Sequence, residues 1–330
     1  MRAVQTREQP QAVLPRRHIL DLNDFTREEI ETVFRTTDGM KEILTRQIKK
    51  VPTLRGKTVL TLFYEASTRT RVSFEQAGKI LGADVINLTT STSSVVKGES
   101  LVDTGRTLQA VRADVIVIRH ASAGAPYLLA QHLQCSVVNA GDGAHAHPTQ
   151  ALLDLYTIRE KLGRIEGLKV AIVGDILYSR VARSNLWGLS TMGACVVLCG
   201  PPPLLPAGFP PPADAVVAGG PALPPVTVET DVDRALDGAD VVMALRIQHE
   251  RMKGGLLPSM TEYARRYQVT EERMARAKPG ALVLHPGPMN EGVEISPDVA
   301  HGTQSVIQEQ VTNGVAVRMA LLYLLCAREA

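Results

Sequence analysis

The chain has no excess of charge of either sign and no long apolar segment, and each shortage excludes a class of function. Its 36 Lys and Arg residues nearly balance 34 Asp and Glu residues, which leaves a net charge of +2. That charge is too small for general polyanion binding, so nucleic acid is not expected to be the main partner. The best candidate for a membrane span, residues 314–327, is short and contains Arg318, so we expect no membrane association.

Cysteine is scarce, and the N-terminus lacks the features of a targeting segment. No CxxC pair is present among the four cysteines, Cys135, Cys195, Cys199 and Cys326. Their apolar surroundings are typical of buried free thiols in a reducing compartment. The first ten residues have no apolar core and no serine, so we expect neither a secretory signal nor a transit peptide. These features predict a cytoplasmic protein.

Motifs of nucleotide, hydrolase and metal sites are also missing. The turn after residues 169–173, which begins at Gly174, lacks the GxGxxG spacing of dinucleotide-binding folds. The chain has no Walker loop and no GxSxG nucleophile elbow. Asp142, His145 and His147 lie close in sequence. A metal needs three or four well-supported ligands and no cysteine is near, so a metal site is disfavoured.

The pattern of the chain predicts an α/β fold. Its 330 residues are too many for one ordinary core, so two domains are expected. Runs of Val, Ile and Leu predict strands covered on both faces at 58–63, 85–88, 115–118, 136–139, 169–173, 195–198, 241–245 and 282–284. Amphipathic segments predict helices at 26–45, 68–81, 101–112, 125–131, 149–162, 180–191, 260–267, 271–277 and 306–328. This alternation predicts parallel sheets flanked by helices, with right-handed crossovers.

We expect the domains to divide near His147. The first would contain residues 1–146, with the last helix (306–330) packed back on it, and the second residues 147–305. Residues 201–225 hold half of the prolines and exclude regular helix or central strand. An exposed loop is favoured there over a proline-rich partner-binding segment, because PxxP spacing arises easily in such a run.

Unusual polar residues follow six predicted strands. In open parallel sheets, ligands bind beyond the carboxyl ends of the strands. The residues at those positions are 65–71, Arg119 and His120, His147 and Gln150, Arg180, Arg246 and Gln248, and 285–288. Their coincidence predicts a shared, cation-rich cleft between the domains.

The first of these sites favours an anion. Ser67 is suited to be the N-cap of a helix, with Thr68 and Thr70 in its first turn. The free N–H groups and dipole of that end, together with these hydroxyls and Arg69, can form a phosphate cradle. An ordinary capped helix with solvated arginines remains the alternative.

Two further segments fit a cleft. Residues 91–100 are rich in Ser and Thr and include Lys97, so they form either a loop that closes over a ligand or, as their composition alone favours, a plain surface loop. His147 precedes a proline at a helix start. There a neutral imidazole, which resists protonation, suits donation to a carbonyl oxygen.

Taken together, these motifs resemble those of the transcarbamoylase family. The stretch from Phe63 to Thr70, FYEASTRT, resembles the family's carbamoyl-phosphate signature. The likeness runs from about Arg17 to the C-terminus and includes KGE at 97–99, RH at 119–120, HPTQ at 147–150, VGD at 173–175, RIQ at 246–248 and HPGP at 285–288. The aspartate-specific members are nearer than the ornithine-specific ones, which usually have Cys-Leu-Pro at the last motif and lack the Arg-x-Gln pair.

The resemblance implies a reaction and an assembly. Carbamoyl phosphate and L-aspartate would give N-carbamoyl-L-aspartate and phosphate, the committed step of pyrimidine synthesis, without a cofactor. The domain of residues 1–146 would bind carbamoyl phosphate and that of residues 147–305 aspartate. The chain would form a homotrimer in which Ser93 and Lys97 serve the neighbouring subunit, which changes the interpretation of their loop. Attachment of regulatory or dihydroorotase-like chains stays open.

The resemblance also implies roles. Catalysis is assigned to Arg69, Thr70, Arg119 and His147. Carbamoyl phosphate would be bound by those four residues and by Ser67, Thr68, Gln150, Gly287, Pro288 and the neighbour's Ser93 and Lys97. Aspartate would be bound by Lys97, Arg180, Arg246 and Gln248. Glu65 would orient an arginine, and no general base is assigned, because the departing phosphate can take the proton.

Some alternatives stay open. The enzyme could carbamoylate another amine such as ornithine, or the chain could be a catalytically silent scaffold. Against a scaffold, a silent copy has no need for so many clustered cations. One departure from the family pattern is Glu291, where many relatives carry arginine.

Overall fold

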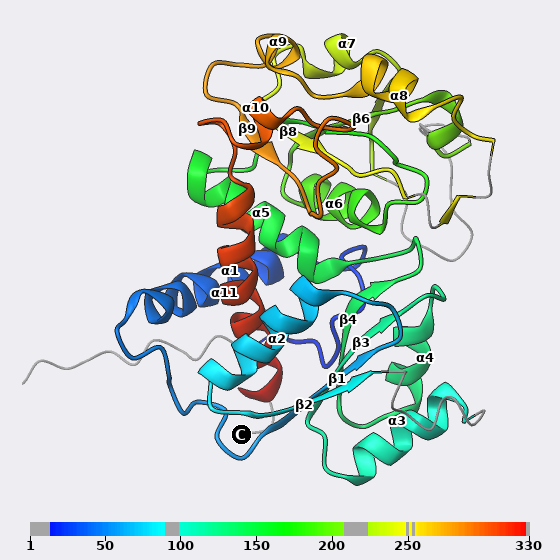
Figure 1. Cartoon of the computed structure of the whole chain (residues 1–330). Helices are drawn as coiled ribbons and strands as arrows, with labels where there is room; N and C mark the ends of the chain where they lie inside the picture. The colour runs from blue at the N-terminus through cyan, green and yellow to red at the C-terminus, as the bar shows by residue number, and fades with distance from the viewer. Residues whose placement is uncertain (1–13, 90–98, 208–223, 249–250, 253–254, 328–330) are drawn as a thin grey trace, which may run out of the picture.

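Two parallel sheets, one above the other in Figure 1, form the framework of the chain. The computed structural model describes residues 14–89, 99–207, 224–248, 251–252 and 255–327. The first sheet has the order β2-β1-β3-β4, with strands Asp84–Thr89, Thr58–Phe63, Val115–His120 and Ser136–Asp142. The second has the order β7-β6-β5-β8-β9, with strands Thr227–Glu229, Cys195–Cys199, Lys169–Val173, Val241–Ala244 and Leu282–Leu284. All registered strand pairs are parallel, which confirms the predicted α/β class.

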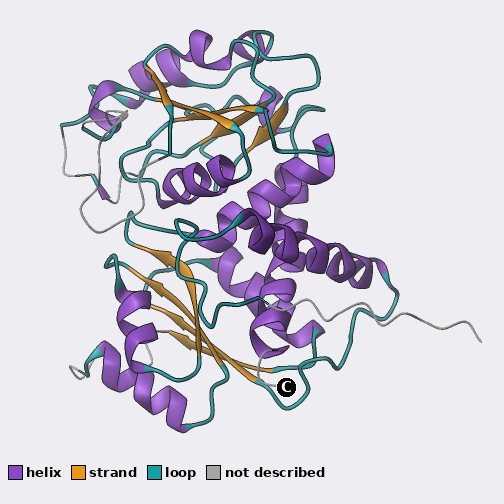
Figure 2. Ribbon diagram, turned by 180° about the vertical axis from the view of Figure 1, so that it is seen from behind, coloured by secondary structure: helices purple, strands orange, loops and turns teal. Residues whose placement is uncertain are grey.

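Helices flank both sheets (Figure 2). The longer ones are α1 (Arg27–Thr45), α2 (Thr68–Ile80), α3 (Leu101–Ala110), α4 (Ala125–His132), α5 (Pro148–Leu162), α6 (Arg180–Thr191), α8 (Met260–Tyr267) and α11 (Ile307–Cys326). Short helices are α7 (Val232–Leu236), α9 (Glu271–Met274) and α10 (Pro297–Ala300). Local chemistry fixes several starts: at α1, Thr26 and Glu29 form a reciprocal capping box.

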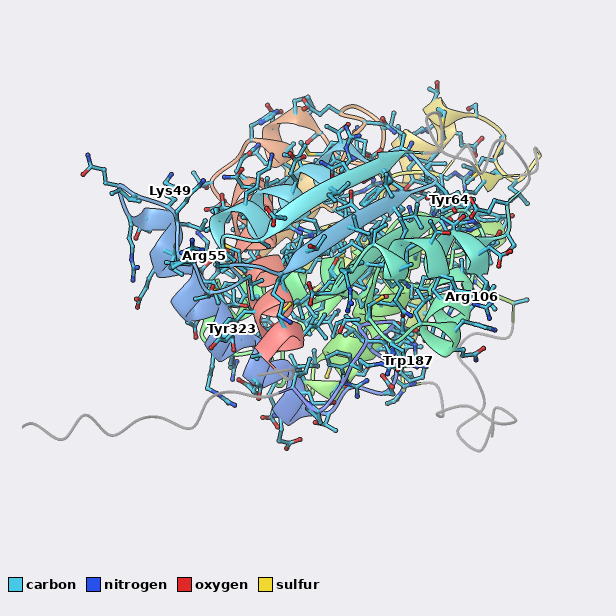
Figure 3. All side chains as sticks on the ribbon, turned by 90° about the horizontal axis from the view of Figure 1, so that it is seen from below. Lys49, Arg55, Tyr64, Arg106, Trp187 and Tyr323 are labelled. Carbon is cyan, nitrogen blue, oxygen red and sulfur yellow. The ribbon has the colours of Figure 1, made fainter. Side chains whose placement is uncertain are left out.

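Helix α11 joins the two halves. It runs from the second sheet along the first (Figure 1) and packs against α1, α2 and α5. One continuous apolar core therefore includes Val59 of β1, Ile172 of β5 and Leu321 of α11, all buried. Charged side chains such as Lys49 and Arg106 lie outside, at opposite sides of the molecule (Figure 3). The division at His147 stays a prediction, since α5 also packs on α6.

The structure departs from the sequence-based expectations at several places. Strand β7 and helices α7 and α10 were not predicted, because three to five residues are too few to show a period. Helix α3 ends two residues early, and Arg112 then adopts a left-handed φ of 68°. Cys195 is exposed at the start of β6, so only three of the four thiols are buried as expected.

The proline-rich segment is only partly described. Pro202–Leu204 form a 3₁₀ turn, and the Leu204 side chain is fully buried, so the expectation of an exposed loop is wrong at that residue. Most of the segment, residues 208–223, lies outside the described residues. In the described part of the chain, no helix is long and apolar enough to cross a membrane.

Candidate active site

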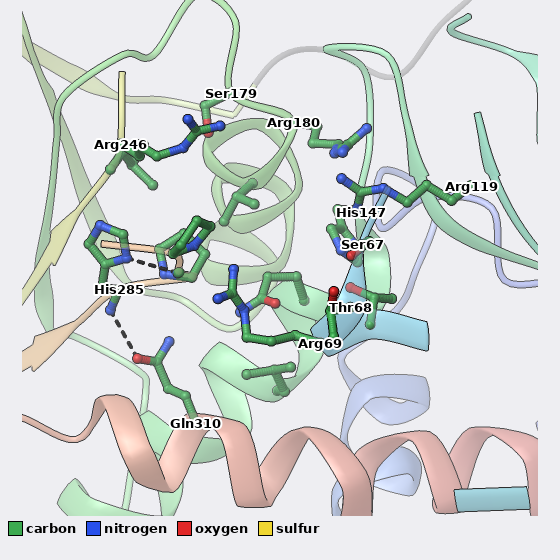
Figure 4. Close-up of a pocket in the computed structure, with 18 of the residues that line it drawn as sticks. Ser67, Thr68, Arg69, Arg119, His147, Ser179, Arg180, Arg246, His285 and Gln310 are labelled. Atoms are coloured by element: carbon green, nitrogen blue, oxygen red, sulfur yellow. Dashed lines mark hydrogen bonds between the residues drawn. The ribbon is translucent and has the colours of Figure 1, made fainter. Parts of the chain in front are cut away.

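A cavity of about 440 Å³ opens between the two sheets, at the carboxyl ends of their central strands. Figure 4 shows basic side chains converging on it from both halves. The predicted site residues that line it are Ser67, Thr68, Arg69, Thr70, Arg119, His147, Gln150, Arg180, Arg246, Gln248, Gly287 and Pro288. Predicted Ser93 and Lys97 lie outside the described residues.

The start of α2 forms one wall. Ser67 is the N-cap in position, with extended backbone angles, but its hydroxyl makes no capping hydrogen bond among the described residues. The predicted side-chain cap is therefore wrong, and the hydroxyl faces the cavity as a potential ligand donor. No acidic residue occupies the first turn of α2, so the positive end of the helix dipole is left for a ligand.

Arg69 crosses the cavity toward the opposite wall. A Cβ at Gly287, whose φ is +63°, would lie 2.9 Å from Cζ of Arg69, so only glycine lets the two approach this closely. Burial, and then the charge of Arg246, lowers the pKa of Arg69. Two cations held near each other in this way favour an anion between them.

The carboxylate of Glu65 lies among three arginine side chains. Its Oε2 accepts from Nη1 and Nη2 of Arg180 at 3.0 Å, and lies 3.4 Å from Nε of Arg119 and 3.8 Å from Nη2 of Arg251. The expectation that Glu65 orients an arginine is met. One carboxylate cannot neutralise three guanidinium groups, so the cluster remains positive.

A break in strand pairing positions Arg119. The register between β3 and β4 shifts between Ile118 and His120, and such irregularities redirect side chains. Nη1 of Arg119 donates to the carbonyl of Ala140 at 3.3 Å. Burial, followed by repulsion from Arg180, lowers the pKa of Arg119 to about 9.

Gly141 makes room for these guanidinium groups. It has φ +117°, and a Cβ there would lie 2.9 Å from Cζ of Arg180 and 3.2 Å from Nη1 of Arg119. Both the backbone angle and the space therefore require glycine.

His147 occupies the N-cap position of α5, without a side-chain capping bond to the helix, and is held neutral. It is only 4% exposed, and burial, then Arg180 and Arg119, lowers its pKa well below the usual value. Its Nδ1 finds no hydrogen-bond partner within the described chain. Its backbone N–H donates to Oγ of Ser184 at 2.8 Å. The side chain can thus donate a hydrogen bond to a ligand without carrying a charge.

The turn after β9 forms the opposite wall. His285 accepts the N–H of Gly287 at Nδ1 (2.8 Å), so its Nε2 carries the proton toward Oε1 of Glu294 (3.1 Å). The backbone N–H of His285 donates to Oε1 of Gln310 at 2.9 Å, as Figure 4 shows. These bonds fix the backbone of residues 285–288 against the cavity.

The loop after β8 carries Arg246 and Gln248. The backbone N–H of Gln248 donates to Oδ2 of buried Asp175 at 3.1 Å. Nη2 of Arg246 lies 3.5 Å from Oε1 of Gln248, so the two side chains are neighbours on one wall. Arg251 follows and donates to the carbonyl of Tyr178 at 3.1 Å.

Sequence reasoning missed several residues that line the cavity. Arg251, Gln310 and Arg318 are the polar ones with long side chains. Arg318 had a usable signal, because a charge within a helix that is apolar on all sides must be buried. It is 4% exposed, and its Nη1 donates to the carbonyl of Gly314 at 3.0 Å. Burial lowers the pKa of Arg318 to about 10.

Glu291 does not belong to the described cavity lining. Its Oε1 lies 3.1 Å from Nε2 of His301 on the surface, so its charge is directed elsewhere. Within the described ranges, no three His, Cys, Asp or Glu side chains gather as metal ligands.

Comparison with known proteins gives a consistent result. Residues 17–160 match the family model for the aspartate/ornithine carbamoyltransferase carbamoyl-P binding domain, and residues 166–325 that for the Asp/Orn binding domain. The chain is 61% identical over 311 residues to the aspartate carbamoyltransferase catalytic subunit of Roseiflexus sp. (strain RS-1), covering 94% of this chain and 95% of that protein.

Solved structures agree. Aspartate transcarbamoylase from Trypanosoma cruzi in complex with N-(phosphonacetyl)-L-aspartic acid is 32% identical with a TM-score of 0.83, over 93% of this chain and 95% of that one. Ornithine carbamoyltransferase from Pyrococcus furiosus is 31% identical with a TM-score of 0.80, over 93% and 96%. The fold is thus common to both substrate classes. The chain belongs to the aspartate/ornithine carbamoyltransferase family.

Proposed function

We propose that the protein is an aspartate carbamoyltransferase that converts carbamoyl phosphate and L-aspartate to N-carbamoyl-L-aspartate and phosphate. This reaction is the committed step of pyrimidine synthesis. The observation that carries this is the convergence of Arg69, Arg119, Arg180 and Arg246 with a neutral His147 on one cavity. The named relative at 61% identity supports the choice of aspartate.

The phosphate would bind at the start of α2. Ser67, Thr68 and Thr70 offer hydroxyls, the helix end offers N–H groups, and Arg69 offers a guanidinium. Ser93 and Lys97 of a neighbouring subunit would complete this part of the site. The resemblance to the family implies both this contribution and a homotrimer, in which no single chain holds a whole site.

The carbonyl oxygen of the carbamoyl group would lie among Thr70, Arg119 and His147. As the amine nitrogen of aspartate attacks the carbonyl carbon, that oxygen gains charge, and donors already in place stabilise it. The bond from carbon to the phosphate oxygen then breaks. The departing phosphate can take the proton that the amine loses, so no protein base is required. The NH2 group would face Gln150 and the backbone of Gly287 and Pro288.

Aspartate would bind on the side of the second sheet. Arg180 suits its α-carboxylate, since Nε and one N–H of Nη2 are not used by Glu65 or Gly143. Arg246 and Gln248, with Lys97, suit the β-carboxylate. Two separate cationic groups are what a dicarboxylate needs, whereas ornithine carries an amine in place of the second carboxylate.

The experiment is a carbamoylation assay with purified protein, carbamoyl phosphate, and either aspartate or ornithine. We expect saturable product formation with aspartate and a loss of more than about 100-fold in kcat/KM for Arg246→Gln, mostly in the KM for aspartate. Arg106→Gln, at an exposed position of α3, is the matched control. Preference for ornithine would overturn the proposal.

A scaffold subunit is the alternative from a different class. Calorimetric titration with carbamoyl phosphate separates the two, because a scaffold should show no saturable heat. We further propose that the protein acts in the cytoplasm. Sedimentation of the purified chain, alone and in lysate, would detect the trimer and any attached regulatory or dihydroorotase-like chains.

A further inference from the structure

A buried carboxylate beneath the cavity receives three side-chain amides. Asp154, on α5, is 0% exposed. Its Oδ1 accepts from Nε2 of Gln150 at 2.8 Å and from Nε2 of Gln310 at 2.7 Å, and its Oδ2 accepts from Nδ2 of Asn185 at 2.9 Å. The three amides come from α5, α11 and α6. Asp154 therefore lies where the helices that carry the cavity walls meet.

An ionised carboxylate can only accept hydrogen bonds, and this fixes the direction of each amide. Gln310 illustrates the consequence: its NH2 group points to Asp154, while its carbonyl oxygen accepts from the backbone of His285. In Gln150 the NH2 group is likewise directed inward, and the residue lines the cavity. Among the described residues none donates to Oε1 of Gln150, so the end presented to a ligand is an acceptor.

The charge at Asp154 suits this task. Burial raises its pKa to about 6, while the three amides and Arg318 act in the opposite direction. Both of its oxygens face amide N–H donors, which is the pattern of an accepting carboxylate. Gln150 and Asp154 are four residues apart on α5 and face the same side. Their contact is therefore built into the helix and does not depend on a ligand.

We propose that Asp154 is a positioning residue that holds the carbonyl oxygen of Gln150 toward the cavity, so that the site selects an acyl phosphate whose acyl group carries an N–H donor. The inference rests on the proposed function and extends it to how the carbamoyl NH2 group is distinguished. A methyl group in that place would leave the acceptor unpaired. A reversed Gln150 would set its own NH2 against that of the substrate.

The test measures selectivity between carbamoyl phosphate and acetyl phosphate, in which a methyl group replaces the amino group. Selectivity is the Ki of acetyl phosphate, as a competitor, divided by the KM of carbamoyl phosphate. Asp154→Leu keeps the branched shape but removes both acceptors, and we expect selectivity to fall about tenfold. If that variant does not fold, Asp154→Asn is the test variant, and its selectivity should also fall, because one carbonyl oxygen cannot fix three amides. The double variant Asp154→Asn with Asn185→Asp restores a carboxylate beside residue 154 and should recover selectivity.

A double-mutant cycle separates positioning from a structural role. If Asp154 acts through Gln150, its substitution should change selectivity no further in a Gln150→Leu background. Thr157→Val is the matched control, because Thr157 is buried at the same contact of α5 with α11 and accepts from Asn313 at 3.0 Å. It should lower stability but leave selectivity unchanged.

The outcomes are distinguishable. Unchanged selectivity in the folded Asp154 variants, or an equal fall with and without Gln150, would overturn the role of Asp154 alone. A wild-type protein that transfers no carbamoyl group to aspartate would overturn the proposed function, and this inference with it.

Discussion

Substitution of Gly141 by alanine tests whether the guanidinium cluster has the geometry described. The backbone at Gly141 has φ +117°, and the new methyl group would lie 2.9 Å from Cζ of Arg180 and 3.2 Å from Nη1 of Arg119. Neither side chain can move freely, since Arg180 is held by Glu65 and Gly143, and Arg119 by Ala140. The methyl group must therefore displace the two arginines or shift the end of β4.

The magnitude has two parts. Forcing a non-glycine residue into this backbone region costs roughly 1–3 kcal/mol of folding stability. Misplacement of catalytic donors by about 1 Å can lower the rate ~100-fold, which corresponds to about 2.7 kcal/mol in the barrier. We therefore expect Gly141→Ala to be less stable by roughly 1–3 kcal/mol and to react over a barrier higher by about 2.7 kcal/mol. The activity loss should be mainly in kcat, because Arg119 is proposed to act on the carbonyl oxygen as it gains charge.

Gly163→Ala is the matched control. Gly163 also has a positive φ, +74°, at the C-cap of α5, but nothing in the described chain lies within 4 Å of a Cβ there. It should lose about 1–2 kcal/mol of stability and keep its activity. Urea unfolding and steady-state kinetics with both substrates measure the two effects. A folded Gly141→Ala enzyme with wild-type kcat would refute the account of the cluster.

Three further predictions concern Arg119, the anion site at Arg69, and the His145–Asp142 pair. Arg119→Met should lower kcat about 100- to 1,000-fold with little change in the KM for aspartate, and an equal rise in that KM would contradict its role at the carbonyl oxygen. Inorganic phosphate should raise the melting temperature, less so at high salt, and should lose this effect in Arg69→Gln but not in Arg106→Gln, as thermal unfolding would show. The hydrogen bond to Asp142, against the effect of burial, raises the pKa of His145. The pair therefore stabilises the folded protein fully below the pKa that His145 has in the unfolded chain, and this stabilisation is lost as the pH rises through the pKa of the folded state. His145→Gln should accordingly destabilise by up to about 1 kcal/mol near pH 5.5 and by less at pH 9 in urea unfolding, and a larger effect at pH 9 would refute the assignment.

Much of the site could be predicted because it is local in sequence. The segment from Phe63 to Thr70 combines a strand end, a helix start and anion-binding side chains within eight residues, and each feature has a known physical meaning. The same holds for Arg246 with Gln248, which follow buried β8 closely, and for His147, which stands at the start of α5 after the short turn that ends β4. Where a local rule failed, the failure was informative: the hydroxyl of Ser67 makes no cap and faces the cavity instead.

Contacts between distant segments could not be predicted in this way. Asp154 reads as one polar residue in a helix, and only the fold brings Asn185 and Gln310 to it. Arg251 is similarly unremarkable until it lies 3.8 Å from Glu65. Periodicity and strand ends identify which side chains face a cleft, but they carry no information on which groups hold those side chains in place.

The arrangement of charge around the cavity opposes folding and favours anion binding. Arg119, Arg180 and Arg251 surround a single carboxylate, Glu65, and their repulsion opposes folding. The lowered pKa of Arg119, Arg180 and His147 reports that desolvation and repulsion. Guanidinium groups crowded in this way bind an anion more favourably, because the ligand supplies negative charge that the surrounding side chains do not. The positive cluster therefore lowers the stability of the ligand-free fold, and the binding of anionic ligands offsets that loss.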